Sequence, residues 1–394
     1  MPEQAVILSA CRTAIGTFLG GLSAMSAPQL GAVVIKEAIR RADIDVNDID
    51  EVIMGQVVQA GSGQAPARQA AIHGGVPARV PAVTVNKVCG SGLKAVMMAA
   101  QAIKAGDGRL FIAGGMESMS NCPYILPGAR TGFKFGDRKI VDLMIYDGLW
   151  DSFNDYHMGN AAEFTAKKSN ISRDEQDEYA LSSQLKAAKA IADGKFKEEI
   201  TPVLVPQPKG EPVPFVTDQG PRADTTIEKL AKLKPAFMKD GTVTAGNAPG
   251  LNDGASALVV CSESYARENN KRVLAKITGY SSCSLEPNML FYAPIEAVRN
   301  LNNKLGVDLN YWDLIEVNEA FAAQVLADGK ELGWDWSKVN VHGGSIALGH
   351  PIGASGARIL TTLIYALKDR GLRKGLATLC LGGGGAVALS LELV

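Results

Sequence analysis

The chain has 394 residues, enough for two or three domain-sized cores, and its 46% hydrophobic and 21% charged residues are ordinary for a water-soluble globular protein. Forty basic residues against 41 acidic ones give a net charge of −1. This balance offers no general attraction for nucleic acid or for an anionic membrane surface, so we expect neither as a partner.

The N-terminal segment and the cysteines indicate a cytoplasmic protein. The opening residues, MPEQAVILSACRT, lack the basic start of a signal peptide and the Arg-rich composition of a transit peptide. No apolar run approaches the ~18 residues that a membrane span needs. The six cysteines are scattered, without a CxxC pair, which argues against a zinc site or a secreted disulfide scaffold. We therefore expect a reducing, cytoplasmic location and no metal.

The first 116 residues alternate between strand and helix patterns. Apolar runs predict buried strands, and apolar residues at helical spacing predict helices between them. The strands are expected at 5–10, 51–58, 81–88 and 109–115, and the helices at 28–42, 66–73 and 89–106. Such alternation predicts parallel βαβ units.

From about residue 117 to 250 the pattern changes to long loops around one strong helix. That helix is expected at 171–196, with a capping box from Ser172 to Glu175 and a stop at Gly194. A Pro-rich stretch follows at 201–222. Long irregular segments are often active-site lids, so we expect an inserted lid or loop domain here.

After residue 254 the alternation returns. Strands are expected at 254–262, 273–282, 313–318, 338–342, 375–381 and 386–393, and helices at 294–305, 319–332 and 354–369. In each outer third of the chain a strand leads through a Gly-rich turn into a helix. This similarity indicates an internal duplication, and two such halves could share a ligand site where the carboxyl ends of their strands meet.

A single thiol, Cys89, stands where the strand 81–88 turns into the helix 89–106. Taken alone, it is more often a small buried hydrophobe than a nucleophile. The positive end of the helix dipole and its free N–H groups are expected to lower the pKa of this thiol below about 8.5. A nucleophilic thiol also needs a nearby base.

The best candidate base is His350, which lies among five glycines between residues 343 and 356. Glycines allow the backbone to approach a ligand closely, although a plain turn with a capping histidine would show the same pattern. A second cysteine, Cys380, precedes the glycines 382–385, whose N–H groups could face an oxyanion. Asn318 and Glu319 stand at the start of the helix 319–332, where helix capping explains both.

Taken together, the blocks NKVCGSGLKAV, NEAFAAQ, GGSIALGHPIGASGAR and CLGGGGA resemble the thiolases, in particular the short-chain acetyl-CoA acetyltransferases. The resemblance extends over essentially the whole chain. It implies an α/β thiolase fold, in which two duplicated αβαβα halves form a five-layered core with an inserted loop domain. By this resemblance the first half is 1–120 with 250–272, the loop domain is 121–249, and the second half is 273–394.

The resemblance also implies residue roles. Cys89 would carry the acyl group, His350 would take its proton, and Cys380 would be the second acid and base. Asn318 would hold a water that stabilises a thioester enolate together with the His350 Nε2. The N–H groups of Cys89 and Gly382 would form the other oxyanion hole. If the two cysteines face one substrate, oxidation could also join them in a reversible disulfide.

Coenzyme A is implied as a substrate and product, with no permanently bound cofactor. The positions that match coenzyme contacts in the family are His157, Met158, Arg222, Phe237, Ala245 and Phe321. Two residues depart from the family pattern: Pro249 replaces a usual Ser, and Phe291 stands where related sequences carry Gly. A homotetramer, a dimer of dimers, is also implied, with 121–145 as a candidate assembly loop.

The implied activity is cleavage of acetoacetyl-CoA by CoA into two acetyl-CoA, and the reverse Claisen condensation, through an acetyl-Cys89 intermediate. A second cysteine suits the proton transfers, because its pKa allows it to act in both directions. Three alternatives stay open: a 3-ketoacyl-CoA thiolase for longer chains, a non-catalytic acyl-CoA binding protein, and a Cys/His hydrolase. A hydrolase would need no second cysteine.

Overall fold

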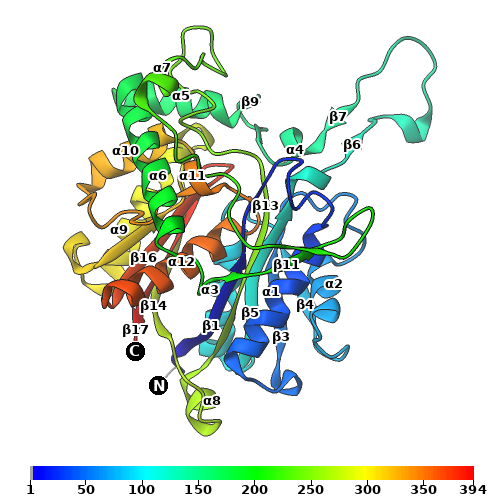
Figure 1. Ribbon diagram of the computed structural model, residues 1–394, viewed down its shortest axis with the longest axis vertical. Coiled ribbons are helices and arrows are strands. Elements are labelled where there is room, and N and C mark those ends of the chain that lie inside the picture. The colour runs from blue at the N-terminus through cyan, green and yellow to red at the C-terminus, as the bar shows by residue number, and fades with distance from the viewer. Residues whose placement is uncertain (1–2) are drawn as a thin grey trace.

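One large sheet dominates the computed structural model, which describes residues 3–394 (Figure 1). Its strands run in the order β15-β16-β17-β14-β1-β13-β5-β3-β4. The bounds are β1 (Ala5–Thr13), β3 (Glu51–Gly55), β4 (Ala82–Val85), β5 (Leu110–Ser118), β13 (Asn252–Ser262), β14 (Ala275–Ser284), β15 (Leu314–Val317), β16 (Lys374–Leu381) and β17 (Gly385–Leu393).

The sheet consists of two similar groups of strands. In the first group β3 lies parallel to both β4 and β5, while β13 runs antiparallel to β5 and β1. In the second, β15 and β16 are parallel and β17 runs antiparallel to β16 and β14. Only the pairs Val6–Lys276 and Ile7–Ala275 join the groups. The position of β13 between β1 and β5 supports the proposal that 250–272 belongs to the first half.

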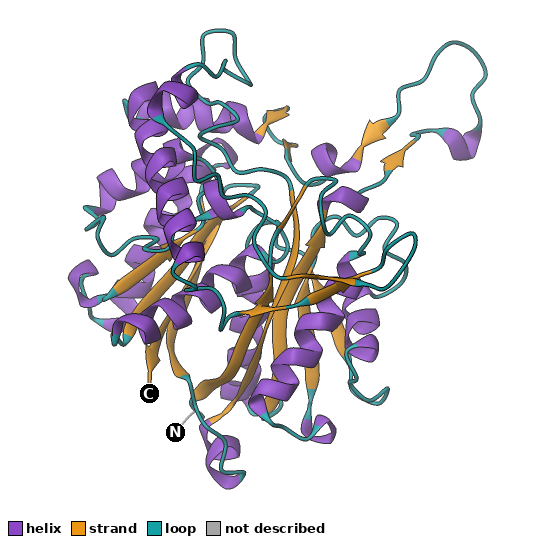
Figure 2. Cartoon of the chain, in the orientation of Figure 1, coloured by secondary structure: helices purple, strands orange, loops and turns teal. Residues whose placement is uncertain are grey.

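Helices form three further layers around these two groups (Figure 2). Helices α1 (Ala27–Ala42) and α2 (Pro66–His73) cover the outside of the first group, and α9 (Ala293–Leu305) covers the outside of the second. Helices α3 (Ser91–Ala105) and α12 (Ser355–Arg370) pack against each other between the two groups. The result is a five-layered α/β architecture, and its central core cluster draws on both groups.

The central pair of helices depends on two glycines. A Cβ added to Gly92 would lie 2.8 Å from the Ala357 N, and one added to Gly356 would lie 2.4 Å from the Leu93 N. Both distances are shorter than real Cβ contacts, so larger side chains would separate α3 from α12. Because Cys89 precedes α3 and His350 precedes α12, this close contact also brings their loops together.

Residues between β5 and β13 form short elements that lie over the carboxyl ends of the strands, and a hairpin there projects from the body (Figure 1). The helices are α4 (Leu143–Tyr146), α5 (Met158–Lys168), α6 (Arg173–Ala192) and α7 (Ile227–Ala231). The strands are β6 (Tyr124–Ile125), β7 (Val141–Asp142), β8 (Trp150–Asp151), β9 (Tyr156–His157), β10 (Ile200–Thr201), β11 (Val203–Val205) and β12 (Val213–Phe215). The capping box expected from Ser172 to Glu175 is confirmed at the start of α6.

The remaining elements are β2 (Gly16–Thr17), α8 (Glu263–Glu268), α10 (Ala322–Leu332) and α11 (Ser345–Leu348). Short 3₁₀ helices lie at 46–48, 119–121, 129–131, 287–292 and 309–311. Among residues 3–394 no helix is both long enough and apolar enough to cross a membrane.

The strand expected at 338–342 is wrong. Only one bridge, between Ile315 and Val339, pairs this segment with β15. The side chain of Asn340 accepts from the Val317 N and donates to the Val317 O, both at 2.9 Å, so a side-chain amide replaces the next step of a strand ladder. Asn340 itself has a φ of +43°, which turns the chain away from the sheet.

The strand expected at 51–58 is also too long, because β3 ends at Gly55. The Gln56 N still donates to the Val85 O on β4 at 3.0 Å, but the two N–H groups after it leave the sheet and donate to a buried carboxylate. Glu117 on β5 accepts from the Val57 N at 2.9 Å and the Val58 N at 3.3 Å.

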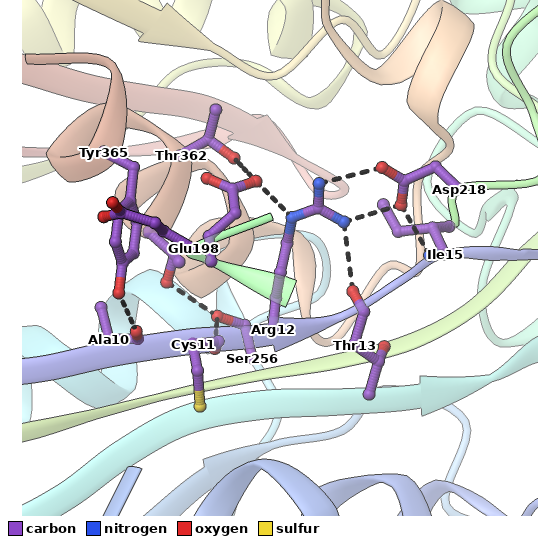
Figure 3. A network of polar contacts seen from close by, with 12 residues as sticks. Ala10, Cys11, Arg12, Thr13, Ile15, Glu198, Asp218, Ser256, Thr362 and Tyr365 are labelled. Carbon is purple, nitrogen blue, oxygen red and sulfur yellow. Dashed lines mark hydrogen bonds and ion pairs between the residues drawn. The ribbon is translucent and has the colours of Figure 1, made fainter. Parts of the chain in front are cut away.

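A buried ionic cluster ties the segment between β5 and β13 to the core (Figure 3). The guanidinium of Arg12, on β1, donates to both oxygens of Asp218 at 2.7 and 2.9 Å and to Glu199 at 2.5 Å. Thr362 on α12 also donates to Glu199, at 3.1 Å. The cluster therefore joins β1, the inserted segment and the second half.

Replacing Arg12 by Met should destabilise the protein by about 3–5 kcal/mol, because Glu199 and Asp218 would remain buried without their cation. Chemical denaturation followed by circular dichroism measures this loss. Arg40→Met is the matched control, since Arg40 pairs with Glu37 but its side chain is 71% exposed, so its loss should leave the free energy of unfolding nearly unchanged. Equal stability losses in the two variants would contradict the importance of the buried cluster.

Candidate active site

A largely apolar pocket of about 340 Å³ lies beneath the inserted segment. Three reactive side chains line it: Cys89, His350 and Cys380. Cys89 is more than 250 residues from the other two in the sequence. Cys89 follows β4, His350 lies in the loop before α12, and Cys380 lies near the carboxyl end of β16. A volume of this size and a mainly apolar lining with a few polar groups are typical of small-molecule sites.

Cys89 lies in a strained turn between β4 and α3. The preceding residue, Val88, has a φ of +47°, a conformation that β-branched residues rarely adopt. The Ser91 hydroxyl holds the turn, since its oxygen accepts from the Lys87 N at 2.8 Å and it donates to the Val88 O at 2.6 Å. The turn therefore fixes the backbone that carries the thiol, two residues before the helix begins.

The expectation that the helix terminus lowers the pKa of Cys89 is wrong for the free site. Burial raises the pKa of the Cys89 thiol to about 12. Although Cys89 keeps some accessible surface because it lines the pocket, protein atoms surround its sulfur. The backbone N–H groups of Cys89 and Gly382 face the sulfur and lower the pKa, but by less than burial raises it. The thiol is therefore neutral and needs a base.

His350 is held at three points. Its backbone N donates to the Asn252 Oδ1 at 2.8 Å. Its Nδ1 lies 2.6 Å from the Ser355 Oγ, and its Nε2 lies 3.4 Å from the Asn318 Nδ2. Burial, reinforced by the nearby Arg358 cation, lowers the pKa of His350 to about 3, so the imidazole is neutral at physiological pH. A neutral imidazole is the form that can accept a proton.

Cys380 closes β16 and faces the same pocket. Burial, followed by the proximity of Cys89 and Asp328, raises the pKa of Cys380 well above its usual range. The chain then reverses through Gly383 and Gly384, with φ values of +81° and +87°. A Cβ on Gly384 would lie 2.4 Å from the Leu285 O, so this turn requires glycine both for its conformation and for its space.

Asn318 and Glu319 do not cap a helix, which corrects the prediction. Helix α10 begins at Ala322, three residues beyond Glu319. Asn318 instead faces His350, with its Oδ1 accepting from the Ser345 Oγ at 2.6 Å. The Glu319 carboxylate accepts hydrogen bonds that tie the inserted segment to the loops around the pocket. Its donors are the Tyr179 Oη, the Ser183 Oγ, the Asn340 Nδ2 and the Ile346 N.

Five of the six expected coenzyme contacts line the pocket: His157, Met158, Phe237, Ala245 and Phe321. His157 also has a structural part, since its Nδ1 accepts from the Gly159 N at 3.0 Å and its ring stacks on Phe237 at 4.8 Å. The sixth residue, Arg222, lies outside this pocket. It lines a neighbouring cavity of about 450 Å³, and both cavities share Ala245, Ala248, Gly250 and Leu251.

Both departures from the family pattern lie in the pocket wall. Phe291 is 2% exposed and meets Phe321 edge-on, with ring centroids 5.5 Å apart, in the cluster that also contains Cys380. Pro249 lies on the opposite loop, next to the shared residues of the two cavities. Phe291 therefore lies in the part of the pocket wall that contains Cys380, and Pro249 lies at the junction of the pocket with the second cavity.

Several residues that support the site were missed by sequence reasoning. Ser345 and Ser355 orient Asn318 and His350, Asn252 holds the His350 backbone, and Glu117 accepts from the Gly353 N at 3.0 Å. The available signal was weak: each is a polar residue within an otherwise apolar or Gly-rich segment. Nothing in the local sequence indicates which distant group such a residue contacts.

Comparison with known proteins finds matches to this chain over nearly its whole length. The model of the thiolase N-terminal domain matches residues 5–264, and that of the thiolase C-terminal domain matches residues 271–393. A protein of Pseudomonas aeruginosa named acetyl-CoA acetyltransferase is 57% identical over 389 residues, which cover 99% of each chain. One of the same name from Cupriavidus necator is 56% identical, with 98% of each chain covered.

A solved structure of a related protein has the same fold over the whole chain. The crystal structure of the Bacillus anthracis acetyl-CoA acetyltransferase superposes with a TM-score of 0.98 at 44% identity, covering 100% of this chain and 99% of the other. The expected α/β thiolase fold is therefore confirmed. Matches to both family models and full-length relatives above 50% identity show that this chain belongs to the thiolase family.

Proposed function

We propose that this protein is an acetyl-CoA acetyltransferase, which cleaves acetoacetyl-CoA with CoA into two acetyl-CoA and catalyses the reverse condensation. The observation that carries the proposal is the meeting of two thiols and a neutral imidazole in one apolar pocket. The full-length similarity to relatives named acetyl-CoA acetyltransferase supports it. The second thiol argues against a simple Cys/His hydrolase, which would not need it.

In the proposed first step Cys89 attacks the 3-carbonyl carbon of acetoacetyl-CoA while its proton passes to the His350 Nε2. The developing oxyanion would accept hydrogen bonds from the N–H groups of Cys89 and Gly382, both of which face the Cys89 sulfur. A positioned base contributes roughly 10²–10⁴-fold and one oxyanion donor roughly 10²–10³-fold. Transfer between a thiol and a neutral imidazole avoids the cost of a pre-formed buried thiolate.

The carbon–carbon bond between positions 2 and 3 then breaks, and its electron pair moves to carbon 2 to give the enolate of acetyl-CoA. The His350 Nε2–H formed in the first step, and a water held by Asn318, would donate to the enolate oxygen. Cys380 would give its proton to carbon 2, which completes acetyl-CoA and leaves a Cys380 thiolate beside acetyl-Cys89. The Asn318 Nδ2 and the His350 Nε2 lie 3.4 Å apart, which is compatible with a shared oxygen.

The second half returns the enzyme to its starting state. The Cys380 thiolate takes the thiol proton of CoA, and the CoA sulfur attacks the acetyl carbon on Cys89. The tetrahedral intermediate would use the same pair of backbone N–H groups, and the departing Cys89 sulfur regains its proton from His350. The acyl-enzyme thus divides one difficult step into two easier ones.

We place coenzyme A across both cavities. The pantetheine arm would pass Met158, Phe237 and Ala245 towards Cys89, and the nucleotide would reach the cavity of Arg222. The residues shared by the two cavities support this continuous path. Lys229 is less available as a phosphate contact, because it already pairs with Asp224 at 2.6 Å.

We also propose a cytoplasmic homotetramer. The six free cysteines suit a reducing compartment. Strand β4 ends the large sheet, so its outer edge is free to pair with a second copy. The hairpin around β6 and β7 carries exposed apolar side chains, with Tyr124 62%, Phe135 92% and Ile140 66% exposed. Such a patch supports its role as an assembly contact. A reversible Cys89–Cys380 disulfide remains a prediction.

Cys89→Ala should reduce thiolysis of acetoacetyl-CoA by more than about 10⁴-fold, because no other group would accept the acetyl unit. Wild-type protein mixed with acetoacetyl-CoA and digested at low pH should show the mass of one acetyl group on the Cys89 peptide. Cys283→Ala is the control, since Cys283 lies outside the pocket and donates to the Ala293 O. Acetylation elsewhere, or full turnover by Cys89→Ala, would refute the acyl-Cys89 step.

Phe291→Ala should shift the substrate preference towards longer chains, because Phe291 occupies the acyl end of the pocket. We expect the ratio of kcat/KM for C8 over C4 3-ketoacyl-CoA to rise at least about tenfold, the low end of the discrimination that one methylene can provide. Steady-state rates across a C4 to C16 series measure this.

Phe111→Ala is the matched control for this experiment, since Phe111 is equally buried at 2% exposure but belongs to the central core. A wild-type enzyme that prefers C8 or C16 substrates would support the longer-chain alternative instead. An unchanged ratio of kcat/KM for C8 over C4 substrates in Phe291→Ala would contradict the proposal that Phe291 limits the acyl pocket.

A further inference from the structure

Five buried polar side chains form one continuous chain of hydrogen bonds behind the pocket. In order they are Arg358, Ser345, Asn318, His350 and Ser355. None of them is more than 7% exposed. The chain starts on α12, crosses α11 and the loop after β15, and returns to the start of α12. Three of its members have no place in the mechanism above: Arg358, Ser345 and Ser355.

The direction of each hydrogen bond follows from the Arg358 end. Arginine can only donate, so the Ser345 Oγ must accept from the Arg358 Nη2 at 3.1 Å. The single hydroxyl hydrogen of Ser345 is then directed to the Asn318 Oδ1, at 2.6 Å. That contact makes the amide oxygen of Asn318 an acceptor and turns its Nδ2 towards the His350 Nε2.

The hydrogen bonds at the Ser355 end independently indicate the same role for the His350 Nε2. The Ser355 hydroxyl donates to the Pro351 O at 2.9 Å, which uses its only hydrogen. The His350 Nδ1, 2.6 Å from the same oxygen, must therefore carry the ring proton and donate it. Neutral histidine has one ring proton, so the Nε2 holds a lone pair. Both ends thus assign the Nε2 as an acceptor.

We propose that Ser345, itself oriented by Arg358, is a positioning residue that locks the Asn318 amide with its Nδ2 towards His350, which favours an unprotonated Nε2 that can take the Cys89 proton. This inference rests on the proposed function, in which His350 is the base. It adds a reason for a buried arginine near a base: the cation sets the direction of the hydrogen bonds of Ser345 and Asn318.

Loss of the Ser345 hydroxyl should change which end of the Asn318 amide faces His350. Without a donor at its Oδ1, Asn318 can rotate and present that oxygen to the Nε2, where it would stabilise a proton. The titratable and charged groups that face His350 are Cys89 before α3, Cys380 at the end of β16 and Arg358 on α12, with His157 across the pocket. Of these only Arg358 is an ion at neutral pH, and it remains in the variant. The pKa of His350 should therefore rise.

The test uses Ser345→Ala in the full-length protein and follows alkylation of Cys89 by iodoacetamide from pH 4 to pH 9, read by peptide mass spectrometry. In the wild type the rate should not fall towards acid pH within this range, because His350 stays unprotonated. In Ser345→Ala an acid limb should appear within this range, so that the rate falls as the pH is lowered towards 4. The kcat for acetoacetyl-CoA should also fall, on the order of 10-fold to 100-fold, the usual cost of losing an outer hydrogen-bond partner.

Two further variants separate this role from general damage. Ser390→Ala removes another fully buried hydroxyl, on β17, which pairs with Thr278 at 2.7 Å, and it should leave the profile unchanged. Asn318→Asp presents only oxygen to the Nε2, so it should shift the acid limb in the same direction as Ser345→Ala. It keeps the test open if Ser345→Ala does not fold.

A wild-type profile in a folded Ser345→Ala variant, or an equal shift in Ser390→Ala, would overturn the proposal. If Ser345→Ala does not fold, an unshifted Asn318→Asp would do so. The alkylation readout needs no turnover, so its outcome is separate from the proposed function. A wild-type enzyme inactive on acetoacetyl-CoA would refute that function, while the alkylation profiles would still decide whether Ser345 sets the state of His350.

Discussion

The structure depends most on the exclusion of water from around three reactive groups. In water a thiol loses its proton above about pH 8.5 and an imidazole gains one below about pH 6.5, but burial works against the charged form of each. Burial raises the pKa of Cys89 to about 12 and lowers that of His350 to about 3. The site is therefore assembled from neutral groups, and charge develops only when the substrate arrives. Hydrogen-bond donors in such a dry site act more strongly than they would in water.

The packing of the two halves provides this enclosure. Gly92 and Gly356 allow α3 and α12 to approach closely, and each helix begins directly after a loop that carries a reactive residue. The inserted segment covers the pocket with Met158 and Phe237, and the Arg12 cluster fastens that segment to β1 and α12. The residues that we propose to be catalytic come from distant parts of the chain and are thus held by rigid elements, while the covering segment would supply the proposed ligand contacts.

Much of this architecture could be predicted from the sequence. Apolar periodicity located most strands and helices to within a few residues, and the resemblance of four motifs indicated the thiolase fold and the residues that meet in the pocket. The errors share one cause, since each depends on a contact with a distant residue. The Asn340 side chain replaces a strand ladder, and Glu319 binds four donors instead of capping a helix. The direction of the pKa shift at Cys89 likewise depends on burial by segments far along the chain.

The most direct measurement of the central claim, that two separate sulfurs act on one substrate, is proton exchange at the methyl group of acetyl-CoA in D₂O, followed by NMR and mass spectrometry. Cys89→Ala should still exchange these protons, because Cys380, His350 and Asn318 remain, although it cannot form an acetyl-enzyme. Cys380→Ala should do the opposite and acetylate Cys89 without exchange. Exchange that survives in Cys380→Ala, or that disappears with Cys89 alone, would contradict the account.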